Sequence, residues 1–185
     1  MQTKTSAFRL LAPLAFALCI ASASAPAAAQ STVLTFNDLA LVSPATVGAS
    51  MPDGYGGFDW GGRYYYMAPT AASGNTTYVA MGSGASTWIR RTDSAAFYFD
   101  GADFWSRRGL DANGDFYFVL SLKGKTVYNG LTAKKGGRML FTGAPTLLKP
   151  DYAGPIDLIA IAFSGNGKDW NHLAFDNFRF RAIAP

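Results

Sequence analysis

The chain has 185 residues, with 16 Lys and Arg, 12 acidic residues that are all Asp, one histidine and one cysteine. One histidine makes a His-rich zinc site implausible, and one cysteine excludes disulfides within the chain. A Ser-His-Asp triad would depend on His172, and no nucleophile-elbow motif accompanies it.

The first 29 residues are typical of a secretory signal peptide. Lys4 and Arg9 form a short basic region, the segment Leu10–Ala21 is largely apolar, and Ala27–Ala29 supplies small residues for cleavage. The apolar run is shorter than the ~18 residues of a membrane span. We therefore expect a secreted or periplasmic protein whose remaining residues, 30–185, form one domain with no membrane span.

Cleavage after Ala29 would remove 29 of the 185 residues, leaving 156, and would lower the formal charge from +4 to +2 because Lys4 and Arg9 are lost. A chain of this length can bury a full core. Nearly balanced charge gives no electrostatic case for nucleic acid, so no nucleic-acid partner is expected.

Short β-prone segments separated by Gly- and Pro-rich turns follow one another along the mature chain, and no convincing helix interrupts them. This pattern predicts an all-β fold, an antiparallel two-sheet sandwich that is jelly-roll-like. The expected strands are Thr32–Phe36, Phe58–Trp60, Arg63–Met67, Thr77–Met81, Ser86–Arg90, Ala95–Asp100, Phe116–Lys123, Thr126–Tyr128, Gly137–Thr142, Ile156–Phe163 and Leu173–Arg181.

Three of these segments carry sharper expectations. Residues 116–123 alternate in polarity and lead through Lys123-Gly124-Lys125 into the next strand, which predicts a hairpin. The segment Ile156–Phe163 is apolar at both parities, as a central strand covered on both faces would be. Three consecutive tyrosines, 64–66, cannot all face one way, so at least one should lie outside.

We read Asp111–Asp115 as a turn and not as a calcium-binding EF-hand loop, because no flanking helices follow.

The two end strands suggest a shared site. Asp176 has the parity of Phe178 in the last strand, and Asp38 has the parity of Phe36 in the first, so both carboxylates should point inward and lie close together. Asn37 and Asn177 could add oxygen ligands, and such hard donors suit a structural calcium ion. The alternative is that both carboxylates accept backbone N–H groups at strand ends.

Aromatic side chains offer a second candidate site, a platform on which sugar rings could stack. The candidate ligand-binding residues are Trp105, Trp170, Tyr64, Tyr66 and Trp88, with Arg90 as a hydrogen-bond donor at the edge. Trp105 and Trp170 adjoin polar turn residues, so we expect these two to be the most exposed. The alternative for each aromatic residue is packing in the core.

Four short motifs resemble those of small exported bacterial proteins of the type associated with a Pro-Glu-Pro C-terminal sorting signal. The motifs are Leu34–Leu39, Pro52–Trp60, Phe97–Trp105 and Phe175–Phe180. The closing motif is also similar to the last strand of jelly-roll carbohydrate-binding modules, where an acid near each terminus often holds a structural calcium ion. The resemblance implies a secreted β-sandwich. The sorting signal itself is absent from this sequence, so anchoring by it is not expected.

The sequence thus predicts an exported, non-catalytic protein that binds polysaccharide or contributes to the extracellular matrix or cell surface. One alternative is a purely structural or adhesive surface protein without a sugar site. The other is a glycan-active enzyme, for which Asp100 and Asp103 are the nearest pair of carboxylates in sequence.

Overall fold

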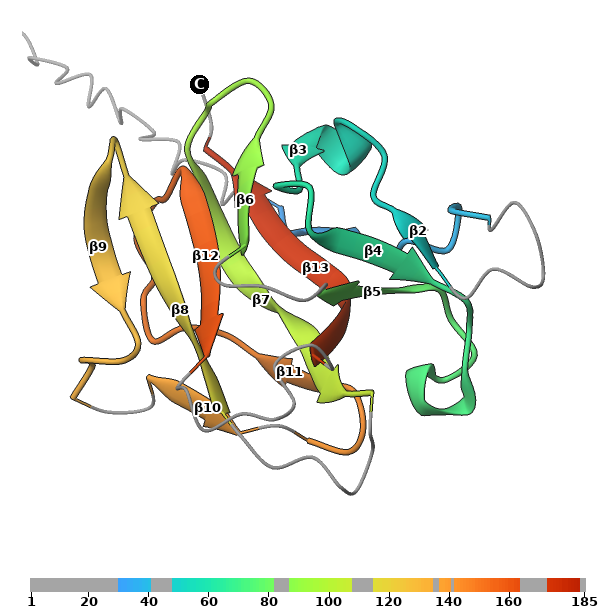
Figure 1. Ribbon diagram of the computed structural model, residues 1–185. Coiled ribbons are helices and arrows are strands. Elements are labelled where there is room, and N and C mark those ends of the chain that lie inside the picture. Colours follow the sequence, from blue (N-terminus) through green and yellow to red (C-terminus); the bar gives the residue numbers. More distant parts are fainter. Residues whose placement is uncertain are drawn as a thin grey trace, which may run out of the picture.

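Two antiparallel β-sheets pack face to face in this protein (Figure 1). The computed structural model describes residues 30–40, 48–81, 87–107, 115–134, 137–140, 142–163 and 173–183. One sheet has seven strands, in the order β11 (Thr146–Leu148), β7 (Phe97–Ser106), β13 (Leu173–Ala182), β5 (Tyr78–Met81), β4 (Tyr64–Met67) and β2 (Gly48–Ser50), with β1 (Thr32–Leu34) also paired to β13.

The other sheet has six strands, in the order β10 (Arg138–Leu140), β8 (Asp115–Leu122), β12 (Leu158–Phe163), β6 (Thr87–Arg91) and β3 (Phe58–Asp59), with β9 (Lys125–Asn129) also paired to β8. Two short 3-10 helices, η1 (Tyr55–Gly57) and η2 (Ala71–Ser73), lie between strands. From β6 onward the chain repeatedly crosses between the sheets, as in a jelly roll. The predicted all-β two-sheet sandwich is confirmed.

Alternate residues of each strand point into the core between the sheets. Many of these inward positions are phenylalanine. Phe58, Phe104, Phe116, Phe118 and Phe175 are each at most 1% exposed. The Phe104 ring contacts the rings of Phe116 and Phe175, and Phe116 contacts Phe118, in tilted or edge-on arrangements. The predicted 116–123 hairpin is confirmed as β8–β9, turning through Lys123 (φ 51°) and Gly124 (φ 72°). Of the three tyrosines, Tyr65 is the exposed one, as expected.

A pair of facing irregularities in β7 and β13 changes which residues face the core. The register between these strands shifts around Gly101 (φ 103°) and Asn177 (φ 51°). As a result, Phe175 and Phe178 both lie in the core although they are three residues apart. The predicted inward parity of Asp176 with Phe178 is therefore wrong, because the irregularity places Asp176 out of phase with the core residues that follow it.

The first strand also ends earlier than expected. β1 stops at Leu34, and Phe36 has a φ of 56°, which ends the alternation before Asp38. A turn follows in which the Leu39 N–H donates to the Phe36 carbonyl at 3.0 Å. Phe36 is buried, whereas Asp38 is exposed, so the predicted inward direction of Asp38 is wrong as well.

β12 is central in its sheet, as expected, since it pairs with β6 on one side and β8 on the other. The expectation that both of its faces are covered is met only in part: Ile159 and Ile161 are buried, but Ala160 and Ala162 on the opposite face are half-buried. Among the described residues, no helix is long and apolar enough to cross a membrane.

Candidate functional site

The outer face of the six-stranded sheet carries a strip of side chains without charge. On β6, β8 and β12, alternate residues enter the core, and the residues between them remain partly accessible. A solvent-facing antiparallel sheet normally carries polar residues at such positions. The half-buried residues here, which we call the outer strip, are Trp88, Tyr117, Val119, Ser121, Leu158, Ala160 and Ala162.

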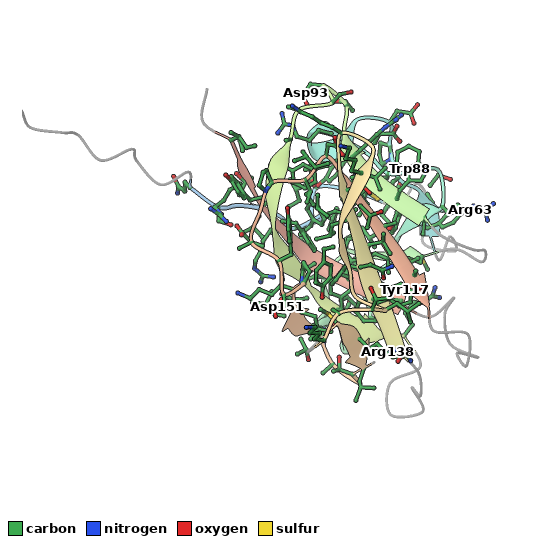
Figure 2. The ribbon with its side chains drawn as sticks, turned by 90° about the vertical axis from the view of Figure 1, so that its left-hand side faces the viewer. Arg63, Trp88, Asp93, Tyr117, Arg138 and Asp151 are labelled. Atoms are coloured by element: carbon green, nitrogen blue, oxygen red, sulfur yellow. The ribbon has the colours of Figure 1, made fainter. Side chains whose placement is uncertain are left out.

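Strand register fixes how the outer strip is arranged. Ala160 on the central strand pairs with Trp88 on one side and with Val119 on the other, and Ala162 pairs with Tyr117. Small side chains thus occupy the middle, with an aromatic residue on each flank. The spacing between strands and the rise per residue along a strand place the Cα atoms of Trp88 and Tyr117 roughly 12 Å apart. Both residues project from the same side of the molecule, at the right of Figure 2.

An ion pair bounds the strip at each end. At one end Arg90 Nη2 lies 3.0 Å from Asp59 Oδ2, and at the other Arg138 Nη1 lies 3.4 Å from Asp115 Oδ2. Arg138 is also the neighbour of Tyr117 in register and lies beyond it in Figure 2. In each ion pair the two opposite charges neutralise each other. The outer strip is therefore an uncharged surface with a neutral ion pair at each end.

Trp88 is held firmly at its end of the strip. The guanidinium carbon of Arg90 lies 4.5 Å from the centroid of the Trp88 ring, in a cation–π contact. Gly61 lies against the same side chain, since a Cβ atom there would sit 3.2 Å from a ring carbon. Asp59 ties these parts together, because its Oδ1 accepts the Gly61 N–H at 3.1 Å while its Oδ2 accepts from Arg90.

Arg90 and Asp59 also line a cavity of about 390 Å³ that adjoins the strip. Met51, Trp60 and Tyr64 provide largely buried walls, 8%, 4% and 1% exposed. The remaining lining residues are Ser50, Pro52, Asp53, Gly54, Gly62, Thr92 and Ser94. The cavity therefore combines apolar walls with charged and hydroxyl groups, and its volume lies in the range of small-ligand sites.

The predicted sugar-binding residues are only partly brought together. Tyr64 and Arg90 line the cavity, and Trp88 stacks under Arg90. Tyr66 is buried in the core at 8% exposure. The expected exposure of Trp105 is wrong: it is 1% exposed, because it packs with Tyr78, Met67, Ala80 and Ala174 in a second apolar cluster. Trp170 lies outside the described residues.

Of the candidate calcium ligands, Asp38 contacts a tyrosine whose pKa also responds to the charge of Asp176. The Tyr55 hydroxyl donates to Asp38 Oδ1 at 2.6 Å. Burial raises the pKa of Tyr55, the hydrogen bond to Asp38 adds to this, and the charges of Asp38 and Asp176 raise it further. Both carboxylates therefore act on the same hydroxyl, although their side chains do not share the inward parity that was expected.

The other three ligand candidates already take part in hydrogen bonds within the protein. Asp176 is 5% exposed and accepts from the Thr76 hydroxyl at 3.0 Å and from the Asn177 N–H at 2.6 Å. Asn37 Oδ1 accepts the Thr77 N–H at 3.3 Å, and Asn177 Nδ2 donates to Asp103 at 2.7 Å. Within the described residues, no group of three or more His, Cys, Asp or Glu side chains could hold a metal ion. The arrangement favours the hydrogen-bonding alternative, and the calcium site stays a prediction.

Asp100 and Asp103, the pair considered for glycoside hydrolysis, are each paired with an arginine of β13. Arg179 donates to Asp103 at 2.8 and 3.0 Å, and Arg181 donates to Asp100 at 2.8 and 3.0 Å. Bidentate pairing of this kind engages both oxygens of each carboxylate. This geometry favours a structural role for both residues.

Sequence reasoning missed Tyr117, Ala160 and Ala162 as candidate site residues. The available signal is the apolar character of residues 156–163 at both parities, which by itself indicates burial on both faces. The same pattern also arises when one face is buried and the other presents an uncharged surface. Asp59 and Ser94 gave no signal, because only the fold brings them to Arg90.

The outer strip and the adjoining cavity could together hold an uncharged, hydroxyl-bearing ligand through apolar contact, ring stacking and a few directed hydrogen bonds. Comparison with protein-family models and with curated proteins gives no match to this sequence. The functional proposal therefore rests on the geometry of the site.

Proposed function

We propose that this protein is an exported, non-catalytic module that binds polysaccharide on the outer strip. The observation that carries the proposal is a half-buried, uncharged sheet face with alanines in the middle and Trp88 and Tyr117 on its flanks. Accessible apolar surface of this kind is a common mark of a binding site. The signal-peptide pattern and the resemblance to exported β-sandwich proteins support the same reading.

The chemistry of the strip suits a sugar chain. Neutral sugar rings present C–H faces that can stack on Tyr117, and they carry no charge, so they need no ionic partner within the strip. Trp88 borders the strip beneath Arg90, whose guanidinium group lies over its ring. Alanines let an extended chain approach the sheet backbone closely. The ion pairs Arg90–Asp59 and Arg138–Asp115 supply polar groups at the two ends, where hydroxyl groups of the chain can be hydrogen-bonded.

The size of the strip argues against a second protein as its partner. Three strands with about six residues each cover roughly 300 Å². A stable protein–protein interface needs about 800 Å² on each partner. A narrow ligand such as a single polysaccharide chain fits the smaller area.

A purely structural or adhesive role is the second candidate, and exposed leucines on short strands favour it. Leu140 on β10 is 73% exposed, and Leu147 on β11 is 50% exposed. β11 is an edge strand of its sheet, and edge strands with apolar side chains promote association between copies. Self-association in solution without glycan binding would support this candidate.

A binding assay with a matched tyrosine control separates the two. Wild-type protein, Tyr117→Ala and Tyr65→Ala would be incubated with insoluble cellulose, chitin and xylan, and bound protein measured. Tyr65 is exposed on the seven-stranded sheet, away from the strip. We expect wild type and Tyr65→Ala to bind at least one polymer and Tyr117→Ala to bind at least tenfold more weakly, with all three giving the same circular dichroism spectrum. Equal binding by all three, or by none, would remove the proposal.

A further inference from the structure

The cavity beside Arg90 has the features of a subsite for one sugar unit. We infer that it binds a single neutral sugar residue, at an end or a branch of the chain, through two adjacent hydroxyl groups. This inference rests on the proposed function and adds to it a second point of recognition and a class of ligand, an uncharged glycan.

The donor and acceptor groups of the cavity are set side by side. Arg90 uses Nε and Nη2 to reach a single oxygen of Asp59, at 3.3 and 3.0 Å. A guanidinium group has five N–H donors, so others remain to face the cavity. The Arg90 and Asp59 side chains are 53% and 39% exposed, which leaves both accessible to a ligand. A donor next to an acceptor matches two neighbouring hydroxyl groups, each of which can both give and take a hydrogen bond.

The charge of the lining favours a neutral ligand over an acidic one. Arg90 is the one cation among the residues that line the cavity, and Asp59 neutralises it. Asp53 adds a further negative charge to the same lining. The net charge is therefore negative, so a uronate or a phosphate would be repelled, whereas a neutral sugar would not.

The walls of the cavity are fixed in place before any ligand arrives. The Trp60 indole N–H donates to the Tyr55 carbonyl at 3.0 Å, which sets the plane of the ring. The Thr92 hydroxyl and the Thr92 N–H both donate to the Gly57 carbonyl, at 3.2 and 3.0 Å, and hold the loop after β6 against η1. A preformed site loses little conformational entropy on binding.

Arg90 connects the cavity to the outer strip. Its guanidinium group covers the Trp88 ring and also lines the cavity. A sugar chain lying on the strip would therefore meet Arg90 where it leaves the sheet face. The outer strip would bind most of the polysaccharide chain, and the cavity would bind one of its sugar units.

The test uses disaccharides, which are long enough for the cavity and too short to cover the strip. Cellobiose, chitobiose and xylobiose would be titrated into the ¹⁵N-labelled protein. We expect at least one to shift the amide signals of Thr92 and Ser94 and the indole signal of Trp60, with the Val119 amide unchanged. Arg90→Gln should weaken this binding at least tenfold. Arg138→Gln, which removes the equally exposed arginine at the far end of the strip, should leave it unchanged.

Because Arg90 also supports Trp88, Asp53→Asn provides a second, milder variant. It should leave the affinity for the neutral disaccharide unchanged and should improve binding of the matching aldobiouronic acid severalfold. Disaccharide shifts confined to the strip, or equal losses in Arg90→Gln and Arg138→Gln, would overturn the inference while Tyr117-dependent polymer binding left the proposed function standing. Disaccharide binding in the cavity without any effect of Tyr117→Ala on polymer binding would contradict the outer strip as the polysaccharide-binding surface and would support the cavity as a sugar-binding site. Absence of both kinds of binding would overturn both.

Discussion

Asp176 is the residue whose surroundings differ most from the sequence-based expectation. It is 5% exposed, yet its oxygens accept from a hydroxyl and a backbone N–H and not from a cation. A carboxylate removed from water needs such donors, because an unsolvated charge without partners is costly. Asn177 is the next residue in the chain, whereas Thr76 lies 100 residues away in sequence, so only the fold brings the Thr76 hydroxyl to this carboxylate.

Replacing Asp176 with alanine tests the hydrogen-bonding reading against the calcium reading. The Thr76 hydroxyl and the Asn177 N–H would lose their acceptor, so the free energy of unfolding should fall by roughly 1–3 kcal/mol. Thermal denaturation with and without EDTA completes the test. We expect the chelator to leave the melting temperature of the wild type unchanged. A lower melting temperature in EDTA, absent in Asp176→Ala, would instead establish a stabilising metal ion.

The same carboxyl group should make stability depend on pH. Burial raises the pKa of Asp176, and the nearby charge of Asp103 adds to the effect. The folded state therefore holds this proton more tightly than the unfolded state, whose Asp pKa is about 3.9. Stability of the wild type relative to Asp176→Asn should rise as pH falls through the raised pKa, and the gain should be complete below about 3.9. Urea unfolding of both proteins between neutral and acidic pH measures it, and a difference that is constant with pH would contradict it.

At Gly54 the backbone conformation decides how much a substitution lowers the free energy of unfolding. Its φ is 72°, and it is the N-cap residue of the 3-10 helix η1 beside the cavity. A Cβ atom there would lie 3.8 Å from Thr92, so space is sufficient and the cost comes from the left-handed backbone. Gly54→Val should lower the free energy of unfolding by more than ~1 kcal/mol. Gly54→Asn, which tolerates this conformation, should cost less, and equal costs measured in urea would contradict the reason given.

Among the elements, β7 and β13 organise the sandwich. They form the longest pairing in the structure, and both change register around Gly101 and Asn177. Before this point one parity of each strand faces the core, and after it the other parity does. The ion pairs of Asp100 and Asp103 with Arg181 and Arg179 then line the opposite face on either side of the irregularity. One local feature thus sets the direction of many side chains.

Gly101→Ala tests how strictly this irregularity depends on glycine. The φ of Gly101 is 103°, and an added Cβ atom would lie 2.6 Å from the Leu148 carbonyl oxygen of β11. Backbone atoms cannot yield easily, so the variant should lose more than ~2 kcal/mol of unfolding free energy. Gly124→Ala is the matched control, since Gly124 also has positive φ but has nothing within 4 Å of the added atom. It should lose about 1 kcal/mol. Similar melting temperatures for both variants would show that the close approach to β11 is unimportant.

At the scale of the whole molecule, two sheets enclose a phenylalanine core, and the six-stranded sheet carries an uncharged strip between two ion pairs on its outer face. The core needs one apolar face from each strand, and in β12 the buried Ile159 and Ile161 contribute to that face. Alanines at 160 and 162 are not needed for the core. Their presence on an accessible face is what connects the architecture to the proposed function.

Export also concerns the whole chain and can be tested directly. We expect the protein produced by bacteria that recognise its signal to begin at Gln30, because cleavage should follow Ala29. β1 begins at Thr32, so this cleavage would leave every residue of the first strand in place. Mass spectrometry of the exported protein measures the new N-terminus. Recovery of the uncleaved chain from the cytoplasm would contradict both the signal and the proposed location.

The sequence by itself determined the fold class and much of the strand pattern, because alternation of side chains and turn residues are local properties. The β8–β9 hairpin and the shared face of Trp88 and Arg90 follow from such local rules. Tertiary structure alone decided the direction of Asp176, the burial of Trp105 and the accessibility of Ala160 and Ala162. The physical reason is that alternation predicts the direction of a side chain only from its neighbours in the same strand. A register change, a second apolar cluster or an uncovered sheet face depends on contacts between segments far apart in the chain.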